Sequence, residues 1–158
     1  MKKFLLLFGI ILTMISCSKE DPLPPCINGD FIATFHIENL FGCEDTRTTM
    51  RVRDLEGNSF KILRNQRDAV NQVTTNKNCG ISQIDFYRYD LLVGQVWVES
   101  NNFKVNYVYI EKCDGQKGMT VELYQNRGGR GHFITYHAII PKLKNGEVPT
   151  VTTRIITP

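Results

Sequence analysis

The sequence lacks the short motifs by which many enzymes are recognised. It contains no Gly-x-Ser-x-Gly turn for a serine nucleophile, no His-Glu-x-x-His zinc motif and no glycine-rich phosphate loop. A Cys-x-x-Cys pair is also missing, which argues against a zinc or dithiol redox site. We therefore expect no metal and no cofactor, and a binding role rather than catalysis.

A strong charge of either sign is also missing. The 19 Lys and Arg residues against 16 acids give a net charge of +3. Loss of Lys2 and Lys3 with a cleaved leader lowers the count to 17 against 16, a net charge of about +1. This balance gives no reason to expect a nucleic-acid partner.

The longest apolar stretch, residues 4–15, is too short for a permanent membrane span. As a helix it covers about 18 Å, against a bilayer core of roughly 30 Å. Lys2 and Lys3 precede this stretch, and Ser16 and Cys17 follow it, which is the layout of a secretory signal peptide. The sequence therefore predicts a signal peptide over residues 1–16. The 142 residues that remain of 158 suffice for one domain.

The tetrapeptide Met14-Ile15-Ser16-Cys17 resembles the lipobox of bacterial lipoproteins, with methionine where leucine is usual. The resemblance implies that the Cys17 thiol carries a diacylglycerol and that Cys17 becomes the new N-terminus. Each buried methylene stabilises the anchor by about 0.8 kcal/mol, so two or three acyl chains hold the protein firmly on a membrane.

The residues after Cys17 indicate which side of the membrane the anchored protein faces. Ser18-Lys19-Glu20-Asp21 is similar to the export signal of Bacteroidota surface lipoproteins, which implies an outer-membrane protein that faces the cell exterior. Three prolines then make a stiff, extended spacer. We expect residues 17–25 to form the lipidated tether and residues 26–158 a single domain.

Four cysteines remain in that domain: Cys26, Cys43, Cys79 and Cys113. An even number in an exported domain predicts two disulfides. If residues 30–38 form one strand, it separates Cys26 from Cys43 by about 30 Å, too far for a bond. Two pairings stay open: Cys26 with Cys79 plus Cys43 with Cys113, or Cys26 with Cys113 plus Cys43 with Cys79.

The apolar pattern of the domain predicts mainly strands. Residues 30–38 alternate in the period of a half-buried strand, and Asn65 with Asp68 three residues later marks the start of one short helix over residues 66–73. The other strands are expected at residues 48–54, 60–63, 84–99, 103–112, 119–125, 132–140 and 148–156. Short turn-rich connections favour antiparallel pairing. We predict an antiparallel β-sandwich or partly open barrel with one short helix.

The second half of the chain, from Asp85-Phe86 to residues 136–142, is also similar to the C-terminal domain of protease-complex-associated proteins. The shared pattern consists of strands that carry no chemistry. The resemblance therefore implies no functional residue.

Histidines offer few catalytic arrangements in this sequence. His36 and Glu38 stand two apart on a predicted strand and could share a face as an acid–base pair, but we expect them to belong to a solvated strand face instead. His132 and His137 are five apart, so a regular strand points them to opposite faces and argues against joint metal binding.

Two other groups of residues are candidates for ligand binding. Arg127 and Arg130 flank glycines in a loop that could hold a phosphate, a sulfate or an acidic glycan, although a soluble hairpin turn has the same composition. Trp97, Tyr107 and Tyr109 could form an exposed platform for sugar rings or a protein partner. A sheet covered on both faces would instead place these aromatics in the core.

These observations together predict a surface-exposed lipoprotein that acts as a binding or accessory module for a protein or glycan. Two alternatives remain from the sequence. One is a small extracytoplasmic enzyme whose site is assembled from distant residues, and the other is a structural envelope protein.

Overall fold

A computed structural model of the chain describes residues 30–32, 34–40, 43, 46–75, 79–100, 102–126 and 128–157. The predicted signal peptide and tether, with Cys17, lie outside the described residues. So do Cys26 and Arg127. None of the helices in these ranges has the length and apolar character needed to cross a bilayer.

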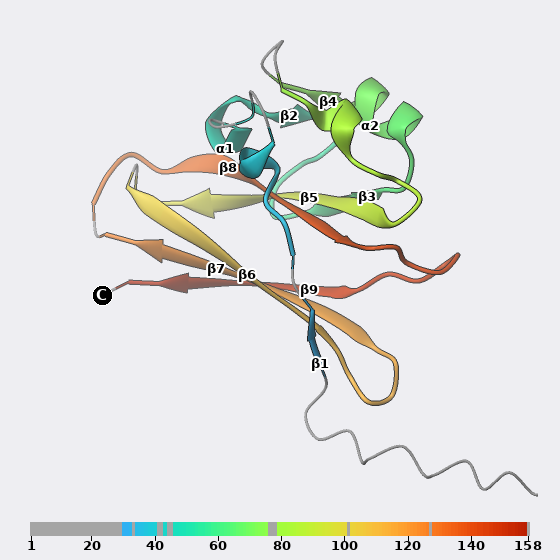
Figure 1. The fold of residues 1–158 in the computed structure, drawn as a ribbon. Coiled ribbons are helices and arrows are strands. Elements are labelled where there is room, and N and C mark those ends of the chain that lie inside the picture. The colour runs from blue at the N-terminus through green and yellow to red at the C-terminus, as the bar shows by residue number, and fades with distance from the viewer. Residues whose placement is uncertain are drawn as a thin grey trace, which may run out of the picture.

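Two β-sheets face each other and form a sandwich (Figure 1). The four-stranded sheet has the order β1 (Asp30–Ile32), β6 (Phe103–Glu111), β7 (Lys117–Gln125) and β9 (Thr150–Ile156). The three-stranded sheet has the order β3 (Phe60–Leu63), β5 (Tyr89–Val98) and β8 (His132–Pro141). The predicted mainly β fold, with a sandwich architecture, is confirmed.

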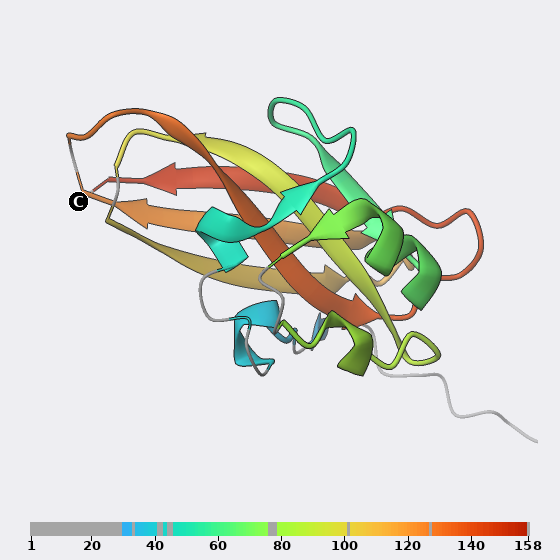
Figure 2. The same ribbon diagram turned by 90° about the horizontal axis from the view of Figure 1, so that it is seen from above.

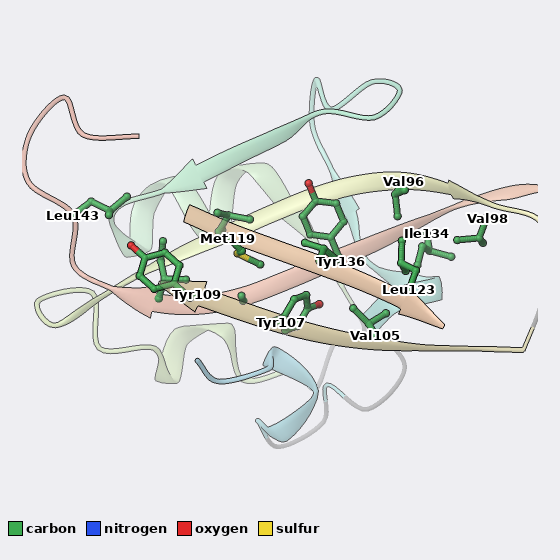
Figure 3. Packing of buried hydrophobic residues seen from close by; sticks show 14 residues of the cluster. Val96, Val98, Val105, Tyr107, Tyr109, Met119, Leu123, Ile134, Tyr136 and Leu143 are labelled. Carbon is green, nitrogen blue, oxygen red and sulfur yellow. The ribbon is translucent and has the colours of Figure 1, made fainter. Parts of the chain in front are cut away.

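The space between the two sheets holds the main hydrophobic core (Figure 3). Alternate residues of each strand point into it, as in β6, where Val105, Tyr107 and Tyr109 are buried while Lys104 and Asn106 are exposed. Each large apolar side chain removed from water stabilises the fold by about 1.5–3 kcal/mol. The alternating pattern of the sequence therefore decides which face of each strand meets the other sheet.

A third layer of short elements covers the other face of the three-stranded sheet (Figure 2). It contains η1 (Ile37–Asn39), α1 (Thr46–Thr49), β2 (Arg51–Val52), α2 (Gln66–Gln72), β4 (Val73–Thr74) and η2 (Ile81–Gln83). Leu91 and Val93 of β5 pack under this layer, whereas Leu92 between them packs in the main core. The three-stranded sheet is thus buried on both faces along this part of β5, which explains the unbroken apolar run there.

A disulfide between Cys43 and Cys79 joins the segment before α1 to the segment before η2. It confirms the predicted alternative that pairs Cys43 with Cys79, and it rules out the other one. Cys113 is disulfide-bonded as well. Cys26, the partner predicted for Cys113 in this alternative, lies outside the described residues.

The segment expected to be one strand over residues 30–38 changes sheets instead. Strand β1 pairs with β6 in the four-stranded sheet, but Phe35 pairs with Ile139 of β8 in the other sheet. Ile37 then begins a 3-10 turn and is fully buried under the third layer. The single-strand prediction is wrong because the segment closes one side of the sandwich, which no local pattern reveals.

Three further expectations need correction. The strand expected at residues 48–54 is the one-turn helix α1 followed by the two-residue strand β2, so α2 is not the only α-helix. The strand expected from residue 84 begins only at Tyr89, after a turn in which the Asp85 carbonyl accepts hydrogen bonds from the amides of Arg88 and Tyr89. Strands β7 and β9 pair in parallel, because β8 lies in the other sheet between them.

The local prediction for α2 is confirmed. The Asp68 backbone N–H donates to Oδ1 of the Asn65 side chain at 2.9 Å, which caps the helix N-terminus as the sequence indicated. Only Ala69 of this helix is buried, so the helix depends on the layer around it for much of its stability.

Candidate functional site

Trp97 and Phe133 form an exposed aromatic pair on the outer face of the three-stranded sheet. They are directly opposite each other in the register of β5 and β8, and their rings meet edge to face with centroids 5.0 Å apart. The residues remain 43% and 47% exposed respectively. Two adjacent exposed rings form a contiguous apolar patch that a ligand could cover favourably, so the pair is a candidate binding surface.

The position of Trp97 explains its exposure. Trp97 shares a strand face with Leu91 and Val93, which the third layer buries, but this layer does not cover the end of β5. The Trp97 backbone N–H donates to Oδ1 of Asn58 at 3.1 Å, which holds this end of β5 against the turn before β3. The aromatic pair thus lies on rigid strands at the uncovered end of the sheet.

The glycine-rich loop that carries Arg130 lies directly against Trp97. A Cβ atom on Gly131 would be 2.2 Å from Cζ2 of the Trp97 ring, so only glycine permits this close approach. Arg130 is exposed, and within the described chain no acceptor forms an ion pair or hydrogen bond with its guanidinium. The structure therefore places the loop that carries Arg130 beside Trp97, and the sequence identified these two residues for separate reasons.

The other two predicted aromatics lie in the core. Tyr107 and Tyr109 are only 7% and 1% exposed, so neither contributes to a surface platform. The Tyr107 hydroxyl accepts a hydrogen bond from the His137 backbone N–H at 2.8 Å. Burial raises the pKa of Tyr109 to about 12. The core interpretation of these two tyrosines is confirmed.

Phe133 was not among the residues that the sequence identified. Its apolar side chain fits a buried position in a strand as well as an exposed one. Its role becomes visible only through the pairing of β8 with β5, which places it opposite Trp97. A prediction of strand register would have been the only available signal.

A buried polar cluster lies between β8 and α1. The Thr46 hydroxyl and Nε2 of His137 are 2.7 Å apart, and their residues are 1% and 0% exposed. This distance would suit a nucleophile and its base, but buried groups cannot reach a substrate without rearrangement of the layer above them. The pair therefore fits a structural role.

The predicted acid–base pair of His36 and Glu38 is not on a strand. His36 precedes η1, and its ring packs on the Tyr107 ring with centroids 4.5 Å apart. Glu38 forms an ion pair with Arg47 at 2.6 Å. His132 and His137 point to opposite sides of β8, as predicted, because Nε2 of His137 contacts Thr46 of the third layer, whereas the His132 ring faces the Phe103 ring of the four-stranded sheet with centroids 6.4 Å apart. Among the described residues, no group of three or more His, Cys, Asp or Glu side chains could hold a metal ion.

Burial also controls the ionisation of the polar cluster. Desolvation lowers the pKa of His137 to about 3, and the nearby positive charge of Arg47 acts in the same direction. The same two causes lower the pKa of His36. Both imidazoles are therefore neutral near pH 7.

We expect the free energy of unfolding to fall as the pH drops from about 6.5 to about 3. Over this range the unfolded chain binds a proton at residue 137, whereas the folded chain keeps His137 neutral, so protonation favours unfolding by up to about 1.4 kcal/mol per pH unit. Urea unfolding at several pH values measures this slope. A His137→Gln variant should show a shallower slope than the native chain. An unchanged slope in this variant would contradict the assignment.

A cavity of about 460 Å³ beside α2 is a weaker candidate for a binding site. Its lining includes Arg64, Asp85 and the exposed Tyr87. The Arg64 guanidinium supplies a positive charge to the cavity lining. This guanidinium donates hydrogen bonds to the backbone carbonyls of Lys144 and Glu147. Arg64 is thus committed to holding the loop before β9, and less of its hydrogen-bonding capacity is left for a ligand.

No protein-family model, no curated protein and no solved structure matches this chain.

Proposed function

We propose that this chain is a lipid-anchored outer-membrane protein that displays a glycan-binding domain outside the cell. The anchor part of the proposal rests on the lipobox-like residues that end at Cys17 and on the export-like residues after it. The Cys43–Cys79 disulfide is compatible with an oxidising compartment outside the cytoplasm.

One observation carries the binding part: an exposed aromatic pair beside an arginine without a partner in the described chain. The C–H face of a sugar ring packs well on an indole or phenyl ring, and the indole N–H can donate to a hydroxyl. Two half-exposed rings provide an area suited to one or two sugar rings. A stable protein interface needs about 800 Å² on each partner, far more than this pair supplies.

Arg130 narrows the class of glycan. A guanidinium that forms no ion pair within its own protein can donate two parallel hydrogen bonds to the carboxylate or sulfate of a ligand. Arg130 directly precedes Gly131, which touches the Trp97 ring. A sugar stacked on the aromatic pair would therefore bring its acidic group near Arg130. The proposed ligand is therefore an acidic polysaccharide.

A binding measurement on intact cells that display the full chain tests this site. Fluorescent polygalacturonate should bind, and neutral dextran of the same length should bind more weakly. Trp97→Ala should reduce polygalacturonate affinity at least about tenfold, equivalent to ~1.4 kcal/mol, because it removes the larger stacking surface. Arg130→Gln should remove the preference for the charged polymer. Tyr124→Ala, which removes an equally exposed aromatic from β7 in the other sheet, is the matched control and should bind as the native chain does.

The same cells separate the anchor from the site. Cys17→Ala should be released or left unprocessed, whereas Trp97→Ala should stay on the membrane and lose only binding. Unchanged membrane retention of Cys17→Ala would count against lipidation. Unchanged polygalacturonate binding by Trp97→Ala would exclude the aromatic pair as the glycan site.

A further inference from the structure

Strand β9 forms a long open edge of the four-stranded sheet. It pairs with β7 on one side only, and five of its seven residues are exposed. No hydrogen bond between described residues reaches the N–H and C=O groups along its other side. Such a row of backbone groups is a template for pairing with another strand.

The other sheet edges are short or covered. Strands β1 and β3 have three and four residues. The edge of β8 is capped by Phe35, which exchanges two backbone hydrogen bonds of 3.2 and 2.8 Å with Ile139. On the same outer side of β8, the backbone N–H of His137 donates a hydrogen bond to the Tyr107 hydroxyl. Among the strands described, β9 is thus the one edge strand longer than four residues with no capping hydrogen bond anywhere along its outer side, and short or capped edges are the usual protection against pairing.

We propose that β9 pairs with β9 of a second copy of this chain, antiparallel, about a two-fold axis at Thr153. This register pairs all seven residues and joins the two four-stranded sheets into one continuous sheet. An antiparallel pairing of identical strands satisfies two-fold symmetry, which is the commonest symmetry of homodimers.

The side chains of β9 suit this register on its core-facing side. Val151, Thr153 and Ile155 pair with Met119, Val121 and Leu123, which face the main core. Around the axis, Val151 of one copy lies opposite Ile155 of the other, so apolar groups meet across the junction. The half-exposed Ile155 becomes covered, and the two cores become continuous.

The solvent-facing side of β9 presents no charge conflict. Thr152 of one copy lies opposite Arg154 of the other, so like charges are not paired directly. Each Arg154 is also next to Glu122 of its own β7, whose pKa it helps to lower. An extended segment of an unrelated protein would find no such self-complementary pattern, which favours a second copy as the occupant.

Variants of the full chain that each gain one extra cysteine test the register. Antiparallel partners directly opposite each other have Cα atoms about 4.5 or 5.5 Å apart, within the range of a disulfide. Thr153→Cys should therefore form a covalent dimer under mild oxidation, seen on a non-reducing gel. Thr152→Cys, one residue away, should not, because its opposite residue is Arg154. Val148→Cys is the control for an exposed position outside the strand.

Sedimentation of the native chain at micromolar concentration gives a second, independent measurement. The native chain should sediment as a dimer, and Thr153→Lys should weaken the dimer at least tenfold because it opposes two ammonium groups on the axis. Thermal melts check that this variant folds. A monomeric native chain, or equal cross-linking of all three cysteine variants, would overturn the proposal. Neither result depends on whether the glycan site is correct.

Discussion

A chain with serine at both Cys43 and Cys79 should lose about 3–4 kcal/mol of unfolding free energy, estimated from the 36-residue sequence separation that the disulfide closes. The bond restricts the unfolded chain across the segment that contains α1, β2, β3, α2 and β4. Its loss releases this conformational entropy. Since small domains are stable by only about 5–15 kcal/mol, much of the stability depends on this bond.

Urea unfolding of the native chain and the double serine variant measures this loss. A reductant provides the internal control, because it opens the bond in the native chain and removes the disulfide of Cys113 from both proteins. The difference between the two proteins should then largely disappear. A difference that persists under reduction would show that the serines act by disturbing the packing of Cys43, which is fully buried.

Gly94→Ala should destabilise the fold by about 2–3 kcal/mol. Gly94 of β5 lies opposite Tyr136 of β8, and the Tyr136 ring covers the position where a side chain would begin. A Cβ atom there would be 2.1 Å from Cζ of the ring. Tyr136 is itself buried in the main core between the sheets, so its ring has little room to move (Figure 3).

Gly118→Ala is the matched control, because Gly118 also lies inside a strand. A Cβ atom there would be 3.5 Å from Cγ1 of Ile110, an ordinary contact, and neither glycine has a positive φ. This control should change the stability by no more than about 0.5 kcal/mol. The double variant Gly94→Ala with Tyr136→Leu should cost less than the sum of the single variants, because a smaller side chain relieves the clash. Strict additivity would contradict this explanation.

Local signals were reliable where neighbouring residues alone decide the structure. The cap of α2 needs only Asn65 and Asp68, and the alternation of β6 and β7 needs only a period of two. These features depend on hydrogen bonds within four residues or on the geometry of a single strand. The mainly β class follows from them.

The pairing of strands that lie far apart in the sequence could not be predicted from local patterns. The segment from β1 to Ile37 has the alternation of one strand, yet it joins two sheets and then enters a 3-10 turn. The parallel pairing of β9 with β7 follows from the return of the chain from the other sheet. Each outcome depends on partners many residues away, whose positions no local pattern contains.

The candidate site divides in the same manner. The sequence by itself identified Trp97 and Arg130 as residues with binding chemistry, and it favoured disulfides in the domain. Only the tertiary structure separated Trp97 from the buried Tyr107 and Tyr109, and only the register of β5 with β8 placed Phe133 opposite Trp97. The physical reason is that side-chain chemistry belongs to the residue, whereas exposure and proximity depend on what the rest of the chain packs against it.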